Sequence, residues 1–229
     1  MCTRYYLLAF IVVVTACSPG KTNKEPDQTK TDHAQPAGNA EAGKLIYSGT
    51  CITCHGNNGE GNKELQAPAL VNTDGWYLRQ QLVNYRNGLR GYSEHDTLGI
   101  RMAAMAKILT DTSAIADVVS YIKTMPAIVM QQSILGDKKT GENIYQSVCG
   151  SCHGPNASGN QKLNAPRLNG LQDWYLKQQL NNFKTSVRGA HPNDTFGAQM
   201  VSMVEMLPDQ KSIDDVVAYI LSETKPASK

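Results

Sequence analysis

The chain has 229 residues, of which 41% are hydrophobic and 18% are charged, with 22 basic and 20 acidic side chains. The formal charge of +2 leaves no basic excess for binding nucleic acid, and the sequence has no Lys/Arg-rich helix with interleaved aromatic residues. The composition therefore argues against nucleic-acid binding. It favours a soluble protein with one large domain or two small ones.

The first segment is typical of a secretory signal. Arg4 precedes an apolar run over residues 5–14, which is too short to span a bilayer comfortably. The next residues, Val14-Thr15-Ala16-Cys17, resemble a bacterial lipobox, which implies cleavage before Cys17 and lipid attachment to it. The alternative is an ordinary cleaved signal followed by an incidental cysteine. We expect residues 1–16 to be a signal peptide and the exported protein to be anchored through Cys17 at the periplasmic face of a bacterial membrane.

Residues 17–38 form a predicted linker. Positions 18–37 contain Pro, Lys, Asp, Thr and Gln but no aromatic or branched aliphatic residue. Such a segment cannot bury enough apolar surface to offset the entropy lost on ordering. We therefore expect a flexible tether between the lipid and the folded body, which raises the effective concentration of the protein near membrane partners.

From Gly43 onward the chain repeats itself without a gap. The offset is 98 positions (149 minus 51), and it pairs CITCHG at 51–56 with CGSCHG at 149–154. It also pairs Trp76-Tyr77-Leu78 with Trp174-Tyr175-Leu176, and Gln80-Gln81-Leu82 with Gln178-Gln179-Leu180. Two tandem copies of one domain explain this pattern. We expect domain 1 over residues 39–126, an interdomain linker over 127–138 and domain 2 over 139–229.

Each copy is predicted to be helical, which makes the expected fold class all-α. Residues 40–48 and 139–146 open the two copies and run up to the cysteines. Residues 74–87 form a second helix with Asp74 as the candidate N-cap, and residues 110–123 form a last helix with apolar residues at helical spacing. Loops such as 56–69 connect them. A domain this small with so much loop is marginal on its own core, so we expect each domain to wrap around something large and apolar.

The C-x-x-C-H pentapeptides identify that group. This spacing is the attachment signature of c-type haem, in which two thiols bond to the porphyrin edge and the next histidine faces the iron. Cys51, Cys54 and His55 in the first copy, with Cys149, Cys152 and His153 in the second, are the predicted haem attachment residues. The sequence thus predicts two covalently attached haem c groups, with His55 and His153 as iron ligands.

Other uses of these cysteines fit less well. A disulfide framework belongs to much shorter chains. A zinc site would need two more Cys or His ligands per copy, yet His95 aligns with Asn193 and His191 aligns with Ser93. A thioredoxin-like motif would need strands in a βαβ pattern, and no alternating apolar run of strand length appears.

A second axial ligand should recur in both copies. Histidine fails this test, whereas Met102 pairs with Met200 and Met105 pairs with Met203. We expect these methionines in the loop before the last helix of each copy. Packing in the core is the alternative role for a methionine at helical spacing, and the pairing alone does not choose between the two members of each pair.

The combined motifs resemble a known family. The series C-x-x-C-H-G-x-x-G-x-G-N, A-P-x-L, Y-L-x-x-Q-L, R-G, D-x-x-G-x-x-M and V-x-x-Y-I resembles class I cytochromes c, and its tandem repetition resembles the di-haem cytochrome c4 group over about residues 40–223. The second copy departs at Ala157 and Ser158, where the first has Gly59 and Glu60.

The resemblance assigns further roles. It implies that Met102 and Met200 are the axial ligands, and that the carbonyls of Pro68 and Pro166 accept hydrogen bonds from the proximal histidines. It also implies two packing pairs between first and last helices, Tyr47 with Tyr121 and Tyr145 with Tyr219. Arg90 and Arg188 are candidates for pairing with haem propionates, with a solvated loop position as the alternative for each.

Electron transfer is the function that this ligand set predicts. Histidine and methionine ligation raises the reduction potential and leaves no open iron position for a substrate. The family resemblance implies single-electron transfer between membrane respiratory complexes, from a quinol:cytochrome c reductase toward a terminal oxidase, with redox proteins as partners and no small-molecule substrate. A cytochrome subunit of a dehydrogenase or oxidase complex is one alternative, and a di-haem peroxidase is another.

Overall fold

The computed structural model describes residues 37–223, and the predicted signal peptide, Cys17 and most of the predicted tether lie outside them. Within the described residues all regular elements are helical, apart from two isolated bridges, Asn62–Ala67 and Asn160–Ala165. The expectation of an all-α fold is confirmed. No helix among the described residues is long and apolar enough to cross a membrane.

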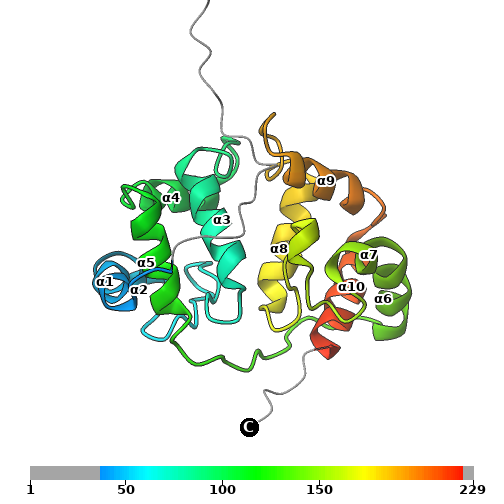
Figure 1. Ribbon diagram of the computed structural model, residues 1–229. Helices are drawn as coiled ribbons and strands as arrows, with labels where there is room; N and C mark the ends of the chain where they lie inside the picture. Colours follow the sequence, from blue (N-terminus) through cyan, green and yellow to red (C-terminus); the bar gives the residue numbers. More distant parts are fainter. Residues whose placement is uncertain (1–36, 224–229) are drawn as a thin grey trace, which may run out of the picture. The chain divides into compact units, whose positions relative to one another are not determined.

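Four α-helical regions recur in each half, in the same order (Figure 1). In the first half they are α1 (Ala40–Ile46) with α2 (Ile52–His55), α3 (Gly75–Arg86), α4 (Thr97–Ala106) and α5 (Thr112–Ile122). In the second half they are α6 (Lys138–Ile144) with α7 (Gly150–His153), α8 (Asp173–Lys184), α9 (Thr195–Val204) and α10 (Gln210–Ser222). The second half adds a short 3₁₀ turn, Gln161–Leu163.

The opening helix of each half is longer than predicted because it passes through a π-helical segment. This segment covers Tyr47–Cys51 in the first half and Tyr145–Cys149 in the second, and each leads directly into the short helix that ends at the histidine. A π-helical turn inserts extra backbone into a helix, so it changes the direction of the side chains that follow. The first cysteine of each C-x-x-C-H motif therefore lies at the transition from the π-helical segment to the short α-helix.

The first and last helices of each half pack against each other. α1 packs on α5, and α6 packs on α10 (Figure 1). An aspartate of each last helix accepts a hydrogen bond from the backbone N–H that precedes the first helix, Asp117 from Asn39 at 2.7 Å and Asp215 from Asp137 at 2.8 Å. The same contact in both halves fixes where the two helices cross.

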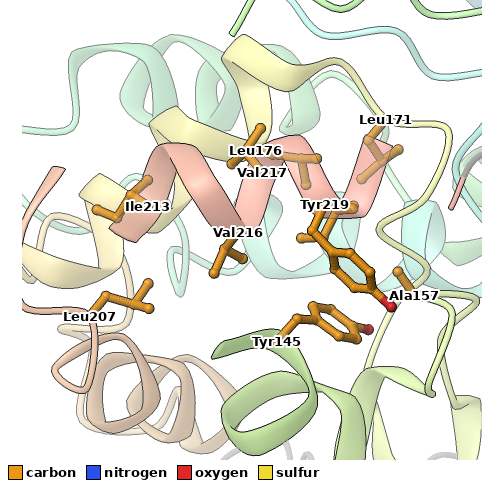
Figure 2. Packing of buried hydrophobic residues seen from close by; sticks show 10 residues of the cluster. Tyr145, Ala157, Leu171, Leu176, Leu207, Ile213, Val216, Val217 and Tyr219 are labelled. Carbon is orange, nitrogen blue, oxygen red and sulfur yellow. The ribbon is translucent and has the colours of Figure 1, made fainter. Parts of the chain in front are cut away.

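The predicted tyrosine pairs are confirmed. The rings of Tyr47 and Tyr121 lie 5.6 Å apart, and those of Tyr145 and Tyr219 lie 5.2 Å apart. The hydroxyl of Tyr145 donates to the carbonyl of Gly154 at 2.8 Å, and Figure 2 shows this ring beside Tyr219 among the aliphatic side chains of α10. The tyrosines thus tie the helix crossing to the end of the C-x-x-C-H segment.

Asp74 takes the predicted N-cap position of the second helix without capping it, whereas an aspartate does cap the last helix. Asp111 caps α5 by accepting from the Ala114 N–H at 2.8 Å. Asp74 occupies the N-cap position of α3, yet its side chain makes no capping hydrogen bond and instead forms an ion pair with Arg167 at 3.5 Å. The carboxylate is therefore used for a long-range contact rather than for the helix end.

Candidate functional site

The C-x-x-C-H residues line a cavity in each half. In the first half Cys51, Cys54 and His55 all lie on the lining of one cavity. In the second half Cys152 and His153 line the cavity, while Cys149 packs beside it against the apolar core. Before haem is attached, burial and the neighbouring thiol raise the pKa of Cys51 to about 11 and that of Cys149 to about 12, so both side chains are then protonated thiols at neutral pH.

Both histidines are held by the backbone of the following loop, as the family resemblance implied. The Nδ1 atom of His55 lies 2.8 Å from the carbonyl oxygen of Pro68, and that of His153 lies 2.8 Å from the carbonyl oxygen of Pro166. A carbonyl oxygen can only accept, so each Nδ1 carries the proton and the lone pair resides on Nε2. Burial lowers the pKa of both imidazoles, which the hydrogen bond offsets in part. Each ring is therefore neutral and suited to coordinate a metal through Nε2.

The expected position of the methionines is wrong in one respect, because they lie on helices rather than in a loop. Met102 and Met105 belong to α4, and Met200 and Met203 belong to α9. Asp96 caps α4 by accepting from the Gly99 N–H at 2.8 Å, and Asp194 caps α9 through the N–H of Gly197 at 2.9 Å. The Asp-Thr-x-Gly pattern in both copies is the sequence signal of this helix start.

Geometry separates the two methionines in the second half. Met200 lines the second cavity, whereas Met203 is 36% exposed and is absent from its lining. In the first half both Met102 and Met105 line the cavity, and both are half-buried. Met200 occupies the position of Met102 in the repeat, so the earlier methionine of each pair is the one that both cavities share.

Arg90 and Arg188 are not solvated loop residues. Arg90 is buried, and its guanidinium donates to the side-chain oxygens of Gln81 at 3.0 Å and Gln179 at 3.2 Å. Arg188 donates to the same two oxygens, at 3.1 Å and 2.7 Å, and to the hydroxyl of Tyr77 at 2.8 Å. Each of the two glutamine carbonyl oxygens thus accepts a hydrogen bond from both guanidinium groups. Gln81 and Gln179 were missed as site residues, although their recurrence in both copies was visible in the sequence.

These arginines leave positive charge in the walls of the cavities. Arg90 lines both cavities, and Arg188 lines the second. Among the described residues no carboxylate lies within ion-pair distance of either guanidinium, and the Nε atom of Arg90 is buried without a hydrogen-bond partner. A buried cation of this kind favours an anionic group in the cavity.

Comparison with known proteins identifies the family of the chain. The cytochrome c family model matches residues 40–126 and again 139–224, and the chain belongs to the cytochrome c family. It is 29% identical to a cytochrome c4 of Thiocapsa roseopersicina over 170 residues, which cover 70% of this chain and 82% of the relative. A crystal structure of reduced cytochrome c4 from Pseudomonas stutzeri matches 80% of this chain and 98% of its own, with a TM-score of 0.62 and 27% identity.

The resemblance to the di-haem cytochrome c4 type is thereby confirmed. A third relative is a cbb3-type cytochrome c oxidase subunit FixP of Bradyrhizobium diazoefficiens, 28% identical over 130 residues that cover 55% of this chain and 43% of the relative. Two tandem cytochrome c domains bring two covalently attached haem c groups, as the sequence predicted.

The residues that line the two cavities fit such a group. Each cavity combines thiols, which attach the porphyrin in c-type haem, with imidazole and thioether donors, which are the ligand types of haem iron in cytochromes c. Its walls are largely aliphatic and aromatic, with Leu78, Leu82 and Leu109 in the first cavity and Leu176, Leu180 and Phe183 in the second. The unpartnered Nε of Arg90 suits an acidic substituent on the porphyrin edge.

Proposed function

We propose that the protein carries single electrons between membrane respiratory complexes, from a quinol:cytochrome c reductase toward a terminal oxidase. The observation that carries this proposal is the recurrence of one donor set, at one register, on two cavities of the same chain. The proposed attachment and ligand residues are Cys51, Cys54, His55 and Met102 for the first haem, and Cys149, Cys152, His153 and Met200 for the second.

The proposed roles of the residues follow from their chemistry. Haem c, when bound, supplies a one-electron iron couple. The Nε2 atom of each histidine and the sulfur of each proposed methionine would ligate the iron, and a His/Met ligand set suits electron transfer rather than substrate binding. The Pro68 and Pro166 carbonyls keep each imidazole in one tautomer, and the apolar walls exclude water, which disfavours the extra charge of the oxidised state.

Replacing either of the two proposed methionine ligands should remove about half of one spectroscopic signal. Oxidised His/Met haem shows a weak long-wavelength band from sulfur-to-iron charge transfer. Met102→Leu and Met200→Leu remove the sulfur while nearly conserving side-chain volume, so each variant should lose about half of the band. The measurement is the near-infrared absorbance of the purified oxidised protein, normalised to haem content.

The matched controls are Met105→Leu and Met203→Leu, which should keep the full band. If a control loses half of the band and its neighbour does not, the ligand assignment moves to the later methionine of that pair. Ready binding of carbon monoxide by the reduced wild-type protein would show an open iron position and would favour a peroxidase instead.

A second candidate is a cytochrome subunit of an oxidase complex. The match to the cbb3-type oxidase subunit favours it, although the chain spans less than half of that relative. Isolation from native membranes in mild detergent discriminates the two. A free carrier travels alone on a sizing column, whereas a subunit co-elutes with its complex at a fixed ratio.

Export and lipid attachment are part of the proposal and depend on the sequence alone. Acylation of Cys17 would anchor the mature protein, since each buried methylene contributes about 0.8 kcal/mol of membrane affinity. We expect Cys17→Ser to move the haem protein from the washed membrane fraction to the soluble periplasmic extract. Cys2→Ser is the control, because residue 2 would leave with the signal. A Cys17→Ser protein that stays on washed membranes would contradict the lipid anchor.

A further inference from the structure

The two halves differ on the solvent-exposed side of the helix that carries the methionines. In the first half this side, here the α4 face, extends into the turn after the helix and consists of Ile100, Arg101, Ala104, Lys107 and Ile108. The corresponding α9 face consists of Ala198, Gln199, Ser202, Glu205 and Met206. All ten side chains are exposed, and their spacing of three and four residues places each set on one side of its helix.

The buried sides of the same helices are alike. The difference between the exposed sides therefore does not follow from the way in which each helix packs on its cavity. Gly99 and Gly197 are both buried at the start of each helix, and Met102 and Met200 both line their cavities. The α4 face, in contrast, carries two cations, Arg101 and Lys107, while the α9 face carries one anion, Glu205. The faces therefore differ by three charges at identical register.

The α4 face also exposes more aliphatic surface than its counterpart. Ile100 is 44% exposed and Ile108 is 55% exposed, and the two cations stand beside them. Single exposed aliphatic residues are ordinary on protein surfaces. Two isoleucines flanked by like charges form the arrangement of a transient interface, which has an apolar centre and a charged rim.

This face lies directly behind the proposed redox site. Arg101 lines the first cavity together with Met102, its neighbour on α4. A protein seated on the α4 face would therefore be separated from the first cavity by a single helix. Any electron passed between two proteins benefits from such close approach, so a docking role here rests on the proposed electron-transfer function.

We propose that the α4 face is the docking surface for an acidic patch on a redox partner protein, and that the α9 face does not bind this partner. The two cations supply charge complementarity and steer the encounter, and the isoleucines supply the contact area. The acidic Glu205 on the α9 face repels the same partner. The two halves thereby present different surfaces to the partners of a two-haem carrier.

The test uses an acidic plastocyanin in its reduced copper(I) form as the probe, mixed with the reduced holo-protein so that no electron passes. Methyl resonances of isoleucine and methionine are followed by NMR at about 0.02 M salt, where surface charges are weakly screened. We expect the signals of Ile100 and Ile108 to shift during the titration and that of Met206 to stay in place. Arg101→Glu combined with Lys107→Glu should weaken the apparent Kd at least about tenfold.

The control is Lys44→Glu combined with Lys138→Glu, which changes net charge equally at two exposed sites outside the α4 face and should leave Kd within about twofold. Absence of any shift, equal shifts at Met206, or an unchanged Kd in the α4 double variant each overturns the docking proposal. In those cases the haem spectra and the result of the methionine-ligand experiment would be unchanged. Loss of the two-haem spectrum, in contrast, would count against the proposed function itself.

Discussion

Replacing Gly43 or Gly141 with alanine should unfold the affected half more readily than any surface substitution. A Cβ atom added at Gly43 would lie 1.9 Å from the carbonyl oxygen of Asp117, and one added at Gly141 would lie 1.9 Å from that of Asp215. These oxygens belong to the backbone of α5 and α10, so no side chain can rotate away. The helices must separate, and we expect a loss of about 3 kcal/mol or more in the free energy of unfolding.

Gly49→Ala is the matched control in the same half. It lies in the π-helical segment, and a Cβ atom added there meets nothing within 4 Å. Because alanine restricts the unfolded chain more than glycine does, we expect this variant to be unchanged or more stable by about 0.5 kcal/mol. Denaturant unfolding of the holo-proteins, followed by circular dichroism, measures all three. Equal stability of Gly43→Ala and Gly49→Ala would show that the crossing of α1 and α5 tolerates a wider spacing.

The helix crossing illustrates what the sequence could not reveal. The apolar spacing in residues 110–123 predicted a buried helix, and Ile115, Val118 and Ile122 are indeed buried. The pairing of Gly43 with Gly141 in the repeat was visible, but a glycine inside a helix is uninformative until the backbone that it approaches is known. Close packing of two helices is a contact between distant parts of the chain, which periodicity does not encode.

The site was more predictable than its surroundings. The C-x-x-C-H spacing is local chemistry, so five residues are enough to propose the thiols and the imidazole, and these side chains line or adjoin the cavities. The acceptors of Arg90 and Arg188 could not, because Gln81 and Gln179 reach guanidinium groups that come from the opposite copy of the repeat as well as from their own. The loop expected around Met102 proved to be a helix because a short helix with one capping aspartate gives little periodic signal.

The predicted interdomain linker shows a further effect of long-range contacts. Residues 126–137 form no helix, yet their backbone is held by buried side chains of the second half, of which Asp173 binds the middle of the segment. Asp173, at the start of α8, accepts hydrogen bonds from the N–H of Ser133 and from the N–H of Ile134 at 2.7 Å. It also accepts from the N–H of Trp174 at 2.7 Å. The equivalent position in the first half is Gly75, so this anchor belongs to the second half alone.

The ionised form of Asp173 should therefore stabilise the protein in a pH-dependent way. Burial alone would raise the pKa of this carboxyl, but the backbone donors of Ser133, Ile134 and Trp174 outweigh burial and lower it. A lowered pKa in the folded state gives stability that is fully present above the pKa of the unfolded chain, which is about 3.9 for aspartate. This stability is lost as the pH falls through the pKa of the folded state.

Asp173→Asn should reduce the free energy of unfolding by about 3 kcal/mol at neutral pH, since charge-assisted hydrogen bonds contribute about 1.5–3 kcal/mol each and the amide nitrogen cannot accept. Asp111→Asn is the control, because asparagine caps a helix as well as aspartate does and should change stability by less than about 0.5 kcal/mol. Denaturant unfolding at several pH values measures the difference between wild type and Asp173→Asn. We expect this difference to be constant from about pH 5 to 7 and to shrink below about pH 4, because protonation then removes the same charge from the wild-type side chain. A difference that stays constant down to the acid limit would mean that the carboxylate charge does not hold the linker.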